Sequence, residues 1–184
     1  LMWQALENGA TLVGGIPHHE KTMEDGARQI EIVFEIAKAK DVNIDMHIDE
    51  TDDPYWVSLE LLAEKTIEEG YQGRVTAGHC TSMAAWDKKT LVRVIDKVKE
   101  ADISVVSNTP INLLLQGRLD EIPVRRGIAR IAELIEAGVN VCCGQDDLMN
   151  MFYPFGQMDP LEVANIAAHA GHLTSPDQIQ VAFD

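Results

Sequence analysis

The chain has 184 residues, enough for one ordinary domain with a sizeable core, and hydrophobic residues make up 46% of it. A net charge of −15, from 30 acidic and 15 basic residues, argues against binding to nucleic acid or to anionic membranes. No apolar run approaches the roughly 18 residues of a membrane span, and three cysteines give no disulfide framework, so we expect a cytoplasmic protein.

Short apolar runs alternate with helical patterns along the chain. Strands are expected at residues 10–17, 42–47, 74–79, 103–108 and 139–143. Helices are expected at 22–39, from Asp53-Pro54 onward, at 91–100, around 128–135 and at 160–173. The strands are continuously apolar, as strands buried on both faces are. This alternation predicts parallel β–α units and an α/β fold.

Three of the expected strands end in residues that bind metals or move protons. His47 closes one strand, with Glu50 three residues later, His79 closes the next, and Asp146 follows the last. In a (β/α)8 barrel the carboxyl ends of the strands form the catalytic rim. This pattern favours part of such a barrel over a doubly wound sheet, which stays open as an alternative. Neutral imidazoles with a carboxylate suit one Zn²⁺ or Fe²⁺ that keeps a position for water.

Several sequence motifs resemble the bacterial cytosine deaminases of the metal-dependent amidohydrolase superfamily. They are IDMHIDETDD at 44–53, RVTAGH at 74–79, LQGR at 115–118 and GQDD at 144–147. GIPH at 15–18, RRGI at 125–128 and YP at 153–154 also match. The resemblance covers essentially the whole chain in order, and the motifs are specific only when taken together.

The resemblance implies a distorted (β/α)8 barrel, of which this chain supplies about strands 4 to 8, and one Fe²⁺ or Zn²⁺. It implies that His47 and Asp146 bind the metal, that Asp146 also accepts a proton from the metal-bound water, and that His79 contacts hydroxide or substrate. Glu50 would carry a proton to the ring nitrogen beside the attacked carbon. The implied reaction is hydrolytic deamination of a cytosine-like heterocyclic base by a metal-bound hydroxide, with release of ammonia.

The resemblance also implies a substrate-facing side for the site. Asp147 would lie near the substrate ring, and Phe152 stands where the family has a tryptophan over the pocket. Relatives act on other aminated or N-alkylated nitrogen rings, so removal of an alkylamine or opening of a cyclic amide stays open. His18 matches a family position, but the motif assigns it no role.

Some parts of the family pattern are missing from these residues. The His-x-His pair of the first strand and the glutamine that grips the pyrimidine are absent. We therefore expect residues 1–184 to be the C-terminal portion of the barrel, without the first strands and the small β-sandwich domain. Exposed parallel strand edges invite pairing, so we expect either that missing residues of the same protein complete the barrel or that a second copy covers the edges, as in a homo-oligomer. An inactive barrel fragment is the remaining alternative.

Overall fold

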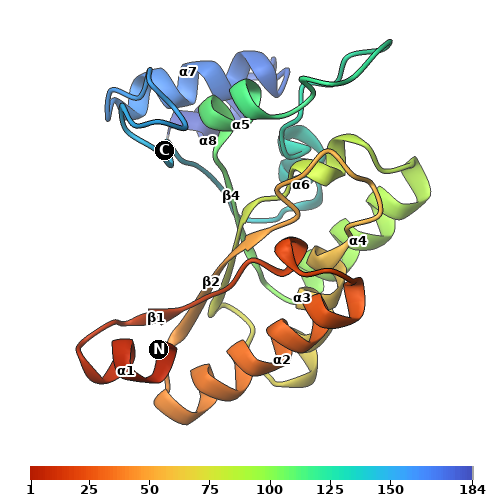
Figure 1. The fold of residues 1–184 in the computed structure, drawn as a ribbon. Helices are drawn as coiled ribbons and strands as arrows, with labels where there is room; N and C mark the ends of the chain where they lie inside the picture. The colour runs from red at the N-terminus through yellow and green to blue at the C-terminus, as the bar shows by residue number, and fades with distance from the viewer. Residues whose placement is uncertain (184) are drawn as a thin grey trace.

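The computed structural model describes residues 1–183 and contains one sheet of five parallel strands (Figure 1). Neighbours in the sheet are also neighbours in sequence, in the order β1-β2-β3-β4-β5. All the carboxyl ends of the strands therefore meet at one edge, which is where the sequence places its polar residues. The strands are β1 (Leu12–Val13), β2 (Asn43–Ile48), β3 (Val75–His79), β4 (Ser104–Ser107) and β5 (Val141–Cys143).

Helices lie in two groups around this sheet. Figure 1 shows α2, α3 and α4 side by side along the strands, while α5, α7 and α8 gather at the other end of the molecule. No helix within residues 1–183 is both long and apolar enough to cross a membrane. The helices are α1 (Met2–Glu7), α2 (Met23–Lys40), α3 (Ser58–Glu68), α4 (Lys88–Glu100), α5 (Thr109–Leu115), α6 (Ile131–Ala137), α7 (Pro160–Ala170) and α8 (Pro176–Phe183), with 3-10 turns η1 (Pro17–His19) and η2 (Thr81–Ala84).

The two faces of β2 differ in burial. Ile44, Met46 and Ile48 are at most 1% exposed and belong to the hydrophobic core, whereas the residues between them are exposed. The expectation that every strand is buried on both faces is therefore wrong for β2. Helices cover only one face of this strand, and His47 projects from the other.

Helix boundaries follow the sequence where capping residues are local. Thr22 accepts a hydrogen bond from the Asp25 amide at the start of α2. Helix α4, expected at 91–100, buries Leu91, Val94, Ile95 and Val98, and Gly138 with its positive φ ends α6. The prediction that Asp53-Pro54 begins a helix is wrong, because α3 starts at Ser58.

Two further elements differ from expectation. The first strand is only Leu12–Val13, and its expected end forms the 3-10 turn Pro17–His19. The segment after β4 folds into helix α5, where the sequence predicted no helix. Proline at the start of α5 suits a first helical turn, where its missing N–H is not needed.

Candidate active site

The site begins where β2 ends. His47 lies in the last part of the strand, and Glu50 follows two residues after it ends. Asp49, between strand and Glu50, has a positive φ of 49°, which breaks the alternation of side chains along the strand. As a result Glu50 Oε2 turns back toward His47 and lies 3.8 Å from its Nδ1.

Asp49 holds this turn in place by hydrogen bonds to helix α3. Its side chain is completely buried, with Oδ1 and Oδ2 each accepting a backbone N–H at 2.9 Å, from Ser58 and Leu59 respectively. These are the first residues of α3, so Asp49 ties the end of β2 to that helix's N-terminus. Burial raises the pKa of Asp49 to about 6, although the two N–H groups pull it down. The Asp49 carboxylate therefore caps the helix and does not face the same side as His47.

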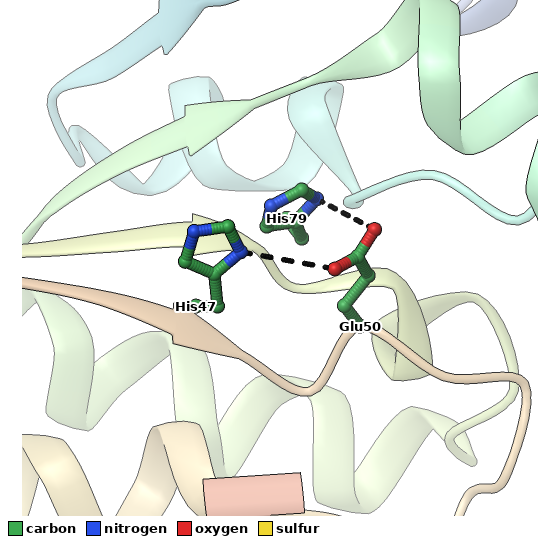
Figure 2. Close-up of side chains that lie close together, drawn as sticks. All are labelled: His47, Glu50 and His79. Atoms are coloured by element: carbon green, nitrogen blue, oxygen red, sulfur yellow. Dashed lines mark ion pairs between the residues drawn. The ribbon is translucent and has the colours of Figure 1, made fainter. Parts of the chain in front are cut away.

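His79, at the end of β3, stacks on His47. Their ring centroids are 4.7 Å apart with an interplanar angle of 28°. Nδ1 of His79 also lies 3.2 Å from Glu50 Oε1, so Glu50 bridges the two rings, as Figure 2 shows. His79 has a φ of 72°, and Asp146 one of 67°. This conformation is strained for residues other than glycine, and such strain is concentrated at functional sites.

Two asparagines that the sequence analysis did not select surround the His79 ring. Asn108 follows β4 and places its Nδ2 3.2 Å from Nε2, while Asn112 in α5 places its Nδ2 3.1 Å from Nδ1. Asn112 Nδ2 is also 3.4 Å from Glu50 Oε1. The sequence did offer a signal for Asn108, because it is a polar residue at the end of a strand, like the residues selected at the ends of the other strands. Asn112 follows it one helical turn later.

Asp146, after β5, reaches the same rim from the far side. Its Oδ2 lies 4.0 Å from His79 Nε2, and its side chain is 25% exposed. The structure therefore brings His47, Glu50, His79 and Asp146 together.

The two residues expected near the substrate lie outside this group. Asp147 accepts a hydrogen bond from Asn150 at 2.7 Å, and the backbone N–H of Phe152 donates to the same asparagine. Phe152 is 58% exposed. Within residues 1–183 neither makes a hydrogen bond or ion pair with the other site residues. The structure describes them as parts of one exposed turn after β5.

Charge and burial divide the roles of the ionisable groups. Interaction with Glu50 raises the pKa of His47. Burial lowers the pKa of His79, against the pull of the nearby carboxylates. Burial acts to raise the pKa of Glu50, but its contact with His47 and the neighbouring imidazoles hold that pKa below its usual value. An ionised Glu50 beside a neutral His79 follows from these shifts.

The pKa of Asp146 shifts in the opposite direction to that of Glu50. Burial raises its pKa, and the neighbouring carboxylate of Asp147 adds to that rise. Carboxylates with separated pKa values are the arrangement that general acid–base chemistry needs.

His18 lies beside the site without an assigned partner. It is 8% exposed, and neither ring nitrogen has a hydrogen-bond partner within the described residues. Burial lowers its pKa to about 4, with the neighbouring His19 adding to the shift. His18 is therefore a neutral, enclosed ring in the same electrostatic environment as Glu50.

The LQGR and RRGI motifs hold a loop over the end of β2. The N–H of Gly117 donates to both carboxylate oxygens of Asp52, at 2.9 and 2.8 Å. Arg125 donates to the carbonyl oxygen of Asp52 at 2.5 Å and pairs with Asp120 within the loop. These motifs are thus accounted for by hydrogen bonds that anchor the loop next to Glu50.

The comparisons with known proteins agree with this geometry. Residues 4–179 match the Amidohydrolase family. The chain belongs to the amidohydrolase family. Its fold superposes with a TM-score of 0.95 on 5-methylcytosine deaminase from Klebsiella pneumoniae liganded with 5-fluorocytosine, at 36% identity over 100% of this chain and 44% of that one. The expectation of an α/β fold that forms part of an amidohydrolase barrel is confirmed.

Two curated relatives of this chain differ in the reactions that their names describe. Pterin deaminase from Rhizobium rhizogenes is 34% identical over 90% of this chain and 37% of its own length. N-isopropylammelide isopropyl amidohydrolase from Pseudomonas sp. is 32% identical over 90% of this chain and 38% of its own length. The chain spans less than half the length of these relatives.

Amidohydrolases use a divalent metal, and the residues present fit one. His47, Glu50 and His79 each offer a ligand atom, and these atoms lie within 4.8 Å of one another. Imidazole nitrogens with carboxylate oxygens are the donor set of Zn²⁺ and non-haem Fe²⁺ sites. Asp146 stands at the edge of this group through His79, so the donor set can extend across the rim from β2 to β5.

Proposed function

We propose that this protein is a metal-dependent hydrolase that deaminates a cytosine-like nitrogen heterocycle and releases ammonia. The single observation that carries the proposal is the convergence of Glu50 and His79 with His47 and Asp146 at one rim. The likeness to a 5-methylcytosine deaminase over the whole chain supports the choice of a small aminated ring.

In this proposal His47 and Asp146 hold the metal, which is Fe²⁺ or Zn²⁺. When bound, such a metal lowers the pKa of a water molecule toward neutrality. Glu50 takes a proton from the attacking water and delivers it to the ring nitrogen beside the attacked carbon. The pKa of Glu50 is held below its usual value, so its carboxylate is ionised and has a free site for that proton.

The remaining site residues bind and orient the substrate. His79 is neutral and enclosed, so we propose that it holds the polar groups that change during attack. Asp146 also accepts a proton from the attacking water, for which its raised pKa is suited. We propose that Asp147 and Phe152 contact the ring from the turn after β5.

We further propose that residues 1–184 form the C-terminal portion of the catalytic barrel. The share of the relatives that the chain spans supports this. A homo-oligomer is part of the proposal, because open parallel strand edges invite pairing with a second copy. We also propose a cytoplasmic location, which the free thiols of Cys80, Cys142 and Cys143 support. The net charge of −15 supports a small-molecule substrate and not nucleic acid or a membrane.

A panel assay on the full-length protein tests this function. The panel holds cytosine, 5-methylcytosine, pterin and N-isopropylammelide, each with zinc-loaded and with iron-loaded protein. We expect ammonia from at least one aminated ring, and no ammonia from a His47→Ala control prepared in the same way. A metal-loaded protein that releases no ammonia from any compound contradicts the proposal.

The second candidate is removal of an alkylamine from a nitrogen ring. The 32% identity to N-isopropylammelide isopropyl amidohydrolase favours it as the runner-up. The same panel separates the two, because this activity would release isopropylamine from N-isopropylammelide and no ammonia from the other compounds.

A further inference from the structure

Three polar atoms meet at one point beside Glu50. Asn112 Nδ2 lies 3.4 Å from Glu50 Oε1 and 3.1 Å from His79 Nδ1, and that Nδ1 lies 3.2 Å from the same Oε1. An ionised carboxylate oxygen only accepts hydrogen bonds, so both of its neighbours must present donors. This requirement fixes the amide of Asn112 with its nitrogen toward Glu50.

The ring of His79 then has one consistent protonation. Asn108 Nδ2 faces its Nε2 at 3.2 Å, so amide nitrogens lie near both ring nitrogens. A neutral imidazole has one N–H and one lone pair, and cannot accept from both. The contacts agree if Nδ1–H donates to Glu50 Oε1 and Nε2 accepts from Asn108. Asn112 then donates to Glu50. Its Nδ2 lies close to Nδ1 of His79 only because both donate to the same oxygen, Oε1 of Glu50.

The position of Asn108 in this arrangement depends on Gly144. A Cβ at residue 144 would lie 2.2 Å from Asn108 Oδ1. The chain after β5 can therefore pass so close to Asn108 only as glycine. The glycine thus leaves room for the Asn108 side chain beside the His79 ring.

Asn112 is retained at a cost to stability. Its side chain is completely buried, and its Oδ1 has no hydrogen-bond partner within residues 1–183. A buried acceptor without a partner destabilises a folded chain. An apolar side chain of similar size would remove that cost. Stability therefore does not explain the amide at position 112, and its N–H donor needs another explanation.

We infer that Asn112 is a positioning residue that, together with His79, commits Oε1 of Glu50 to two hydrogen bonds and leaves Oε2 to move the proton. Oε2 points toward His47, as Figure 2 shows. The inference rests on the proposed function. A proton passes from the attacking water to Oε2 and then from Oε2 to the ring nitrogen of the substrate, which restores the carboxylate.

The test uses Asn112→Leu and its matched control Asn140→Leu in the full-length, metal-loaded protein. Asn140 is exposed and bonds to Ser104 Oγ at the opposite ends of the strands. For Asn112→Leu we expect kcat to fall about 10- to 100-fold, with KM and metal content unchanged and Tm unchanged or higher. Asn112→Asp keeps the shape and loses the donor, so it should lose as much kcat. This second variant serves if the leucine variant does not fold.

A double-mutant cycle shows whether Asn112 acts through Glu50. In a Glu50→Gln background, Asn112→Leu should change the remaining rate less than threefold. Equal losses in both backgrounds overturn the inference, as does a kcat near normal or a loss of metal in Asn112→Leu.

A measurement without turnover keeps this result separate from the proposed function. Nitrogen-15 NMR of histidine-labelled, zinc-loaded protein, with His79→Asn for assignment, should show the proton of His79 on Nδ1. A proton on Nε2 overturns the inference whether or not a substrate is found. A protein that deaminates nothing but carries the proton on Nδ1 defeats the proposed function and keeps the hydrogen-bond arrangement.

Discussion

The two ends of the rim that carries the candidate site differ in how deeply their residues are buried. At the ends of β2 and β3, Asp49 and His79 are at most 1% exposed, and Asp49 is held by two backbone N–H groups. After β5, Phe152 is 58% exposed. The turn that carries Glu50, which we propose transfers protons, is thus held by buried contacts, whereas Asp147 and Phe152, which we propose contact the substrate, lie in an exposed turn.

We propose that this difference separates the residues that transfer protons from those that recognise the substrate. A proton-transfer group must stay within hydrogen-bond reach of its target, and packing supplies that precision. A substrate-facing turn can vary without loss of the fold, as loops generally do. Relatives of this chain that act on pterins and on N-isopropylammelide fit such a division.

The largest expected effect is on the fixed side. In the full-length protein, Glu50→Gln should lower kcat by about 10²- to 10⁴-fold, because a neutral amide cannot accept and return a proton. Metal content should stay at the wild-type level. Glu68→Gln is the control, since the Glu68 side chain is 68% exposed and distant from the rim, and its kcat should not change. Steady-state ammonia release measures both, and a near-normal rate would remove Glu50 from the mechanism.

The metal-binding roles come next. His47→Ala should weaken metal affinity at least about tenfold, because it removes a nitrogen donor and even outer partners of metal ligands cost that much. Asp147→Asn, in the exposed turn, should retain the metal. Metal analysis after dialysis compares the two variants. Equal retention in both would mean that His47 does not bind the metal.

Asp49→Ala sharpens the comparison through stability. The change leaves the amides of Ser58 and Leu59 without their acceptor and should lower the free energy of unfolding by about 2–3 kcal/mol. Asp53→Ala, which loses one exposed bond to the Tyr55 amide, should cost less than about 1 kcal/mol. Urea unfolding measures both. Equal losses would show that the buried turn contributes no special stability.

The smallest effect is expected at the exposed turn. Phe152→Ala should leave Tm unchanged, since exposed substitutions usually stay within about 0.5 kcal/mol. It should change kcat/KM by about tenfold and alter the order of preference among the panel compounds. A calorimetric scan with the panel assay checks this. A large fall in Tm would show that Phe152 supports the fold.

Much of this arrangement could be predicted from the sequence because its signals are local. Apolar periodicity predicted α4, and the ligand-type residues at strand ends predicted that His47, His79 and Asp146 would meet at one rim. The roles of these residues stay predictions.

Other parts depend on contacts between distant segments. The start of α3 was misplaced because its amides are capped by Asp49, nine and ten residues earlier, and no cap is visible nearby. Asn112 was missed because its partners, Glu50 and His79, are 62 and 33 residues away along the chain. Helix α5 was missed because its buried residues pack against the later helix α7.

Anomalous X-ray diffraction from crystals of the full-length protein, collected at the iron and zinc absorption edges, tests the central claim most directly. We predict one ion at the rim, bound by His47 and Asp146, with Glu50 beside it. An ion bound elsewhere, or a rim that stays empty in protein that deaminates a substrate, would contradict it.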